Sequence, residues 1–270
     1  MLFRQDDGDD SAVVAIPQPS HSWLSGQLVR AWGNGRFDRP APHEEVCLAA
    51  EQHDIGWLPW EAAPTLNPET GRPHQFMELG AAVHTRLWTG GVRMALAFGR
   101  YPALLVSLHA NTIYGRFFDF AKASPEDAAI VRDFLDGQHA FQHASVEALA
   151  ADPRYAAAGA ARLETIEHNR LLVGAADWMS LAICWGVAGE TRIPDVPTTG
   201  GTGRTELRLA SPHGSTASLT VDPWPFAEDR VEVVCEGRRL RGRFADEAAM
   251  RDALEAAEPV TIRTVLHPTA

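Results

Sequence analysis

The stretch Leu48-Ala49-Ala50-Glu51-Gln52-His53-Asp54-Ile55-Gly56 places an adjacent histidine and aspartate at the end of an apolar helical run. His53 falls at helical spacing from the apolar residues before it, so we expect its ring to point inward. Asp54 lies one step around the helix and can face the same cavity from its edge. Gly56 then allows the chain to turn at the helix C-terminus. Because two buried polar groups are costly without a partner, the His-Asp pair predicts a divalent metal site.

Further histidines fall on the inward faces of predicted helices. His21 lies in the first turn of a helix that ends near residue 32, and its alternative role is a capping or surface histidine. His84 lies on a predicted helix over residues 76–98, and His109 lies on another over residues 102–118. A single histidine on an apolar face is usually a core residue, but two on successive helices after a His-Asp pair favour ligands. The pair His139 and His143 stands in a polar stretch, so we expect it on the surface.

Asp177 lies in the most apolar helical run of the chain, within a helix predicted over residues 155–186. A carboxylate in such surroundings needs a cation or several hydrogen-bond donors. Arg170 stands at the helical repeat from Asp177 and could reach the same pocket. We therefore predict that Asp177 is a metal ligand, with pairing to Arg170 as the alternative.

The sequence His53-Asp54-Ile55-Gly56, after a helix of small residues, resembles the signature of the HD-domain superfamily of metal-dependent enzymes. This resemblance implies a metal site formed, in chain order, by His21, His53, Asp54, His84, His109 and Asp177. The first-helix histidine, the His-Asp pair and the late aspartate would bind one ion, and the two remaining histidines would complete a second site bridged by Asp54. The whole chain also resembles a bacterial family of unknown function.

The resemblance further implies a phosphohydrolase that acts on a small phosphorylated molecule or a nucleotide. His53 and Asp54 would be its catalytic pair, and one or two divalent ions would activate water and hold a phosphate oxygen. Nitrogen and oxygen ligands favour iron or manganese, with zinc, magnesium and nickel as the alternatives. A di-iron oxygenase of the HD type and a non-catalytic, metal-bearing binding module are the two alternative functions.

The loop after the His-Asp pair supplies most candidate substrate contacts, since loops beside metal sites often hold the substrate. Trp57 and Trp60 either line the pocket or pack beneath the loop, because large aromatic residues serve both purposes. Glu61, Arg72 and Arg170 are the candidate charged contacts, and the alternative for the loop residues is a solvated position.

Composition limits the partners of this 270-residue chain. Its formal net charge of -11 argues against nucleic-acid binding, because a phosphate backbone requires a basic surface. No apolar stretch reaches the ~20 residues needed to span a bilayer, and no signal peptide is recognised. Three scattered cysteines favour free thiols in a reducing compartment, with Cys47 and Cys184 in the core. We expect a cytoplasmic protein whose oligomeric state the sequence leaves open.

The order of the predicted elements favours a mostly α-helical fold, an HD-like helical bundle over residues 1–190. A linker-like Gly/Thr run at residues 198–203 leads to a small β-rich (α+β) module over residues 200–270. Strands are expected at residues 205–209, 217–221, 230–235 and 260–266, with a helix over residues 246–257. A short edge strand at residues 13–16 would pair with this module.

Overall fold

The computed structural model describes residues 1–6, 8–9, 11–201, 203–211 and 216–269, which form a layered α+β fold. Its main sheet has seven strands in the order β1-β2-β8-β9-β7-β6-β5. The strands are β1 (Leu2–Gln5), β2 (Ala12–Ile16), β5 (Glu190–Pro197), β6 (Arg204–Ala210), β7 (Ser218–Asp222), β8 (Val231–Arg241) and β9 (Glu258–Pro268). A separate two-stranded sheet pairs β3 (Leu66–Asn67) with β4 (Arg72–Pro73).

The main sheet joins the two ends of the chain. Strand β2 pairs antiparallel with β8, with Val13 opposite Leu240, and β8 pairs antiparallel with β9 along most of its length. Strands β7 and β9 are the parallel pair in this otherwise antiparallel sheet. In β8 buried and more exposed residues alternate, as expected for a strand with one face on the core. One face of the sheet is therefore available to the helices.

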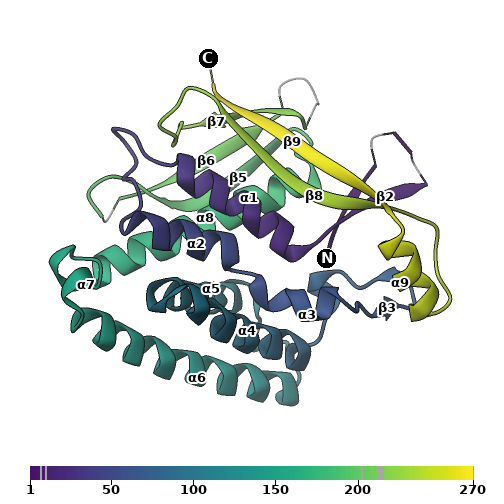
Figure 1. The fold of residues 1–270 in the computed structure, drawn as a ribbon, viewed down its shortest axis with the longest axis horizontal. Helices are drawn as coiled ribbons and strands as arrows, with labels where there is room; N and C mark the ends of the chain where they lie inside the picture. The colour runs from purple at the N-terminus through teal and green to yellow at the C-terminus, as the bar shows by residue number, and fades with distance from the viewer. Residues whose placement is uncertain (7, 10, 202, 212–215, 270) are drawn as a thin grey trace.

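The helices lie in layers beneath the sheet (Figure 1). The α-helices are α1 (Gln18–Ala31), α2 (His43–Gln52), α3 (Leu58–Glu61), α4 (Ala81–Ala95), α5 (Arg100–Phe117), α6 (Pro125–Ala150), α7 (Pro153–Ala157), α8 (Leu163–Trp185) and α9 (Glu247–Glu255). The short 3-10 helices are η1 (Ile55–Trp57), η2 (Phe76–Glu78) and η3 (Leu96–Phe98). Helices α1 and α8 lie directly under the sheet, while α4, α5 and α6 form the layer farthest from it.

Helix α8 is buried at the centre of the molecule because it is apolar around most of its circumference. It lies against the sheet on one side and against α1 and α5 on the other. Asp177 and Ser180 are its buried polar residues near the middle of the core. Burial of the whole helix therefore brings a carboxylate into the interior, where it must find partners.

The prediction of a mostly α-helical fold is wrong, because a seven-stranded mixed sheet forms one whole layer. The four expected C-terminal strands and α9 are confirmed, but strand β5 was not predicted. The N-terminal strand β2 is not an edge strand, because β1 covers its other side. Pairing of residues this far apart in sequence is decided by tertiary contacts, which a pattern of local periodicity does not contain.

The division of the chain near residue 190 remains a prediction. The sheet contains strands from both predicted parts, and residue 202 of the predicted linker lies outside the described residues. All three cysteines are buried, which confirms the core positions of Cys47 and Cys184, and His139 and His143 are exposed as expected. None of the helices in the described part of the chain combines the length and apolar character needed to cross a bilayer.

Gly56 has a different role from the one expected at a helix C-terminus. Its φ is not positive; instead, η1 packs so tightly on α4 that an added Cβ would lie 2.2 Å from the Leu87 carbonyl oxygen and 2.9 Å from Gly91. Side chains would not fit at this contact without a shift of the backbone. Gly56 therefore holds the segment that carries the His-Asp pair close to α4.

We expect Gly56→Ala to destabilise the protein by about 1–3 kcal/mol, the usual range for overpacking a tight contact. The matched control is Gly90→Ala on α4, where an added Cβ meets no atom within 4 Å. The control should be neutral or stabilising by up to about 1 kcal/mol, because alanine favours a helix over glycine. Urea unfolding of both variants measures the difference, and equal midpoints would contradict this role of Gly56.

Candidate metal centre

His53 caps the C-terminal end of α2, and its hydrogen bonding determines which nitrogen faces the interior. Its Nδ1 donates to the Ala50 carbonyl oxygen at 2.8 Å, since a carbonyl can only accept. Its Nε2 lies 3.3 Å from Asp177 Oδ1 and 3.6 Å from Asp54 Oδ2. A neutral His53 would therefore direct an Nε2 lone pair at two carboxylates, which repel it. The arrangement becomes favourable when Nε2 is protonated or when a metal ion lies between these atoms.

His21 reaches the same point from α1. Its Nε2 lies 2.9 Å from Asp54 Oδ2, and its Nδ1 lies 2.8 Å from Ser180 Oγ. The Ser180 hydroxyl donates its one hydrogen to the Asp177 carbonyl oxygen at 2.8 Å, so Nδ1 of His21 donates to Ser180. Ser25 also donates to Ser180 Oγ at 2.9 Å. This network orients His21 with its Nε2 toward Asp54.

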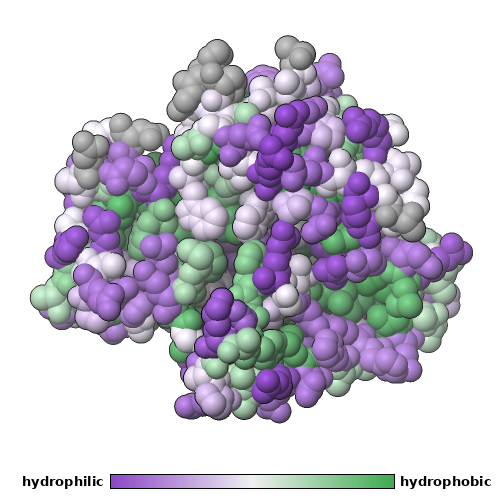
Figure 2. Space-filling view, turned by 180° about the vertical axis from the view of Figure 1, so that it is seen from behind, coloured by the Kyte–Doolittle hydropathy of each residue, from purple (hydrophilic) through white to green (hydrophobic). Residues whose placement is uncertain are grey.

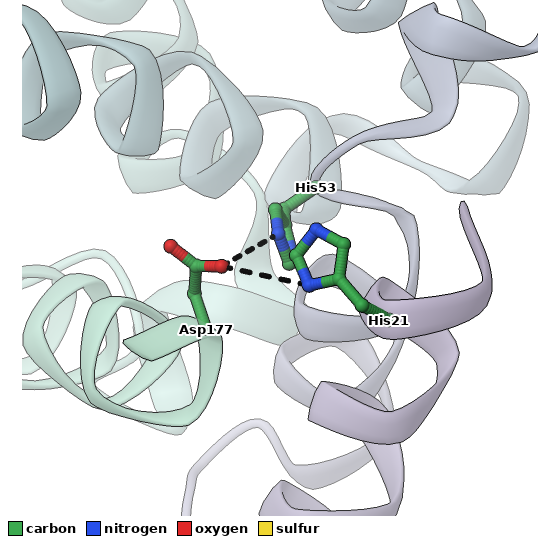
Figure 3. Close-up of side chains that lie close together, drawn as sticks. All are labelled: His21, His53 and Asp177. Atoms are coloured by element: carbon green, nitrogen blue, oxygen red, sulfur yellow. Dashed lines mark ion pairs between the residues drawn. The ribbon is translucent and has the colours of Figure 1, made fainter. Parts of the chain in front are cut away.

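Figure 3 shows His21, His53 and Asp177 directed toward one another from three separate helical segments. One ligand atom from each of these residues lies within 4.8 Å of the others. His109 of α5 completes the cluster, with Nε2 3.4 Å from Asp177 Oδ2. We use the name His/Asp cluster for His21, His53, Asp54, His109 and Asp177. All five side chains are buried.

The electrostatics of the His/Asp cluster favour a positive charge. Burial alone would lower the pKa of His53, but the carboxylates of Asp54 and Asp177 outweigh it and raise that pKa to about 9. Burial would raise the pKa of both carboxyl groups, yet the neighbouring histidines hold both values below the usual range. Asp54 and Asp177 therefore stay charged in the interior, which is costly unless a cation compensates them.

The cluster fits a divalent ion in size and ligand type. A small central cavity of about 40 Å³ is lined by four of the five cluster side chains, all except that of His53, with Gln18 and His84 also in its wall. Ligand atoms around one ion at ~2.1 Å would lie about 3–3.5 Å apart. The pairs His53–Asp177 and His109–Asp177 lie at 3.3 and 3.4 Å, through different oxygens of Asp177. The buried Gln18 Oε1 has no hydrogen-bond partner among the described residues, although its Nε2 donates to Asp54 Oδ2 at 3.2 Å. An unpaired buried oxygen at this wall could accept a hydrogen bond from a water molecule bound to a cation.

His84 lines the central cavity without joining the His/Asp cluster. Its Nδ1 lies 2.8 Å from the Tyr114 hydroxyl, and its ring meets Trp57 edge-on at 5.5 Å. Burial lowers the pKa of His84. In the described residues, no hydrogen bond or ion pair connects it with Asp54 or Asp177. His84 is thus placed at the cavity wall, and its role as a ligand stays a prediction.

Two larger cavities of about 500 Å³ each meet the central cavity at Asp177. The polar chamber is lined by residues that include Asn111, Thr112, Arg116, Arg170, Asp177 and Asp195. The aromatic chamber is lined by residues that include Phe76, Tyr114, Phe117, Phe118, Trp178 and Trp185. The stacked rings of Phe117 and Trp178 border both chambers. A substrate can therefore approach Asp177 from a polar side or from an apolar side.

The predicted substrate contacts are distributed unevenly around these cavities. Trp57 lines the central cavity, whereas Trp60 is buried behind it and packs against the Trp57 ring. The Glu61 side chain is buried and accepts from the Gln18 backbone N–H at 2.9 Å, so it supports the start of α1. It lines none of the three cavities around Asp177. Arg72 lies on β4 with its Nε 3.5 Å from the Gly242 carbonyl oxygen, outside all three cavities around Asp177. Arg170 lines the polar chamber.

Arg170 does not pair with Asp177. Its guanidinium donates to Glu167 at 2.7 Å and to Thr112 Oγ1 at 2.6 Å. The alternative in which Arg170 neutralises the buried aspartate is therefore wrong. Asp177 is instead surrounded by three histidine rings, as in a metal site.

Sequence reasoning missed several residues that the structure places at the site. Gln18 and Ser180 orient members of the His/Asp cluster, and Tyr114 orients His84. Gln18 and Ser180 each lie on the same helix face as a predicted ligand: Gln18 three residues before His21, and Ser180 three after Asp177. Polar residues at that spacing were the signal available in the sequence.

The fold and site together define an α+β protein with a buried histidine–carboxylate cluster reached from two chambers. A protein family described as "Protein of unknown function (DUF3891)" matches residues 1–242. Because the match covers most of the chain, the protein belongs to this family. Comparison with curated proteins and with solved structures gave no match.

Proposed function

We propose that this protein is a metal-dependent phosphohydrolase that acts on a small phosphorylated molecule or a nucleotide. The observation that carries the proposal is the His53 Nε2 atom, which is buried and directed at the carboxylates of Asp54 and Asp177. The resemblance of residues 53–56 to the HD-domain signature supports the same function. Membership of that superfamily is part of this proposal.

The His/Asp cluster would hold the metal. His21, His53, Asp54 and Asp177 would bind the first ion, and His84 and His109 would contribute to a second. Iron or manganese suits these nitrogen and oxygen ligands, with zinc, magnesium or nickel as alternatives. When bound, such an ion supplies Lewis acidity and lowers the pKa of water.

The protein's own residues would orient the reaction. Ser180 orients the ring of His21, and the Ala50 carbonyl orients the ring of His53. Gln18 donates a hydrogen bond to Asp54. Arg116 brings a positive charge to the polar chamber, where it lies over the rings of Phe117 and Trp178. Its nearest carboxylate is that of Asp195, at 3.9 Å. An anionic group of the substrate could therefore approach Asp177 beside Arg116.

A second candidate function is an HD-type di-iron oxygenase. The aromatic chamber favours it, since an apolar wall beside the cluster would suit chemistry on a carbon–hydrogen bond. A non-catalytic metal-binding module is the third candidate. We place hydrolysis first because the chamber that contains Arg116 and Arg170 also reaches Asp177.

The test is phosphate release from a panel of nucleotides and phosphate esters by protein loaded with manganese or iron, with oxygen uptake measured in parallel. We expect phosphate release by the wild type and a loss of on the order of a hundredfold or more in His53→Asn. The control His139→Asn alters an exposed histidine on α6 and should keep full activity. Oxygen uptake without phosphate release would show that the oxygenase, not the hydrolase, is the function. If neither activity is found across the panel, the non-catalytic binding module is the remaining candidate.

A further inference from the structure

The aromatic chamber has the shape and lining of a binding site for a flat apolar group. Its volume of about 500 Å³ lies within the range of small-molecule sites, ~300–1,000 Å³. Two ring pairs in its wall are nearly parallel: Phe76 with Trp185 at 19° and Phe117 with Trp178 at 6°. A planar ring packs against aromatic side chains of this kind with favourable geometry.

Polar groups in the aromatic chamber are concentrated where it meets the His/Asp cluster. His84 and Asp177 belong both to this chamber and to the central cavity, and Tyr114 donates or accepts a hydrogen bond at His84. Asp127 is a half-buried acidic residue of the wall, at the start of α6. A ligand with one polar end and one apolar body therefore fits with its polar end at the cluster.

The rim of the aromatic chamber is unusually apolar for a surface. Met77 is 65% exposed, Phe117 55% and Trp185 37%. Large apolar side chains left in water around a cavity indicate a site that a ligand covers. Apolar surface on the face drawn in Figure 2 lies in patches between hydrophilic ones. A small molecule is the occupant that matches a patch of this size.

We propose that the aromatic chamber binds an aryl group of the substrate, so that the protein acts on the phosphate monoester of a flat aromatic alcohol. Hydrolysis of this ester rests on the proposed function, whereas binding of the aryl group in the aromatic chamber does not. Water adds to phosphorus, the bond from phosphorus to the aryl oxygen breaks, and the products are the aromatic alcohol and inorganic phosphate. An aryl group is chosen over an alkyl chain because a rigid ring loses less conformational freedom on binding.

The test compares 2-naphthyl phosphate, octyl phosphate and methyl phosphate, together with 2-naphthol as a probe that lacks the phosphate. The variant Ala81→Trp fills the aromatic chamber from the first turn of α4. The control Gly90→Trp adds the same side chain on the same helix, at a position where a Cβ meets no atom within 4 Å. Metal content, binding by calorimetry and kcat/KM are measured for all three proteins.

The wild type and Gly90→Trp should bind 2-naphthol, and their preference for 2-naphthyl over methyl phosphate should exceed that of Ala81→Trp by at least about tenfold. Ring burial adds binding free energy only where the chamber is open, whereas the better aryl leaving group favours 2-naphthyl phosphate in all three proteins. Ala81→Trp should lose the binding of 2-naphthol and keep only the preference that the leaving group supplies, while it keeps its metal. Octyl phosphate as the best substrate, or 2-naphthol binding unchanged in Ala81→Trp, would overturn the proposal.

Failure of the inference and failure of the proposed function give different results. Hydrolysis of both esters with the same ratio of naphthyl to methyl rates in the wild type and in Ala81→Trp would retain the hydrolase and remove the aryl site. Binding of 2-naphthol that Ala81→Trp abolishes, without hydrolysis of any ester, would retain the aryl site and remove the hydrolase.

Discussion

Asp177→Asn should reduce the bound metal to below about a tenth of the wild-type content, because even loss of a residue that only supports a ligand costs ~10–100-fold in affinity. Asparagine keeps the volume but removes the charge that the three surrounding histidine rings face. A cation would then have Asp54 as its remaining buried carboxylate in the His/Asp cluster. Elemental analysis after growth with iron and manganese measures the effect, and phosphate release should fall with the metal.

The control for Asp177→Asn is Asp195→Asn, which removes an exposed carboxylate from the polar chamber without touching the cluster. Its metal content should equal that of the wild type. Circular dichroism shows whether Asp177→Asn is folded, so that loss of metal is separated from loss of structure. If folded Asp177→Asn retains its metal and is merely less stable, Asp177 is a structural partner of the histidines and the metal site is wrong.

Removal of the metal by a chelator should lower the melting temperature of the wild type by on the order of 10 °C. An ion present at about a thousand times its Kd stabilises the folded state by about 4 kcal/mol. In a chain of this size each kcal/mol shifts the melting temperature by roughly 2–4 °C. The physical reason is that the buried carboxylates of Asp54 and Asp177 lose the cation that compensates them.

The same chelator should shift the melting temperature of Asp177→Asn by less than about 2 °C, because that variant has little metal to lose. Differential scanning calorimetry of both proteins, with and without chelator, makes the comparison. Equal shifts in the two proteins would show that the chelator removes an ion from another site. No shift in wild type would show that the cluster is satisfied by protons on its histidines.

Much of the candidate site was visible in the sequence because its residues break the local pattern. His53, Asp54 and Asp177 are polar residues within apolar helical runs, and their burial confirms the inward direction that helical spacing predicted. Arg72 was chosen from a loop, where no periodicity indicates a direction, and it lies outside the cavities. Residues on regular helices were therefore placed more accurately than residues on loops.

The fold was harder to predict than the site. Strand β5 carries Pro194 and Pro197 and several charged residues, a composition that does not favour a strand. It exists because it pairs with β6 and covers α8. Likewise, β2 lies inside the sheet because β1 and β8 happen to pair with its two edges.

The sequence by itself determined which side chains had to find partners in the interior, because a buried carboxylate or imidazole is costly wherever the chain places it. Tertiary structure alone decided that α1, α2, α5 and α8 bring five of these side chains to one point, and that the two ends of the chain share one sheet. It also decided that an aromatic chamber and a polar chamber meet at Asp177. Helical spacing acts over a few residues, whereas these arrangements depend on packing between segments more than a hundred residues apart, whose free energy no local pattern records.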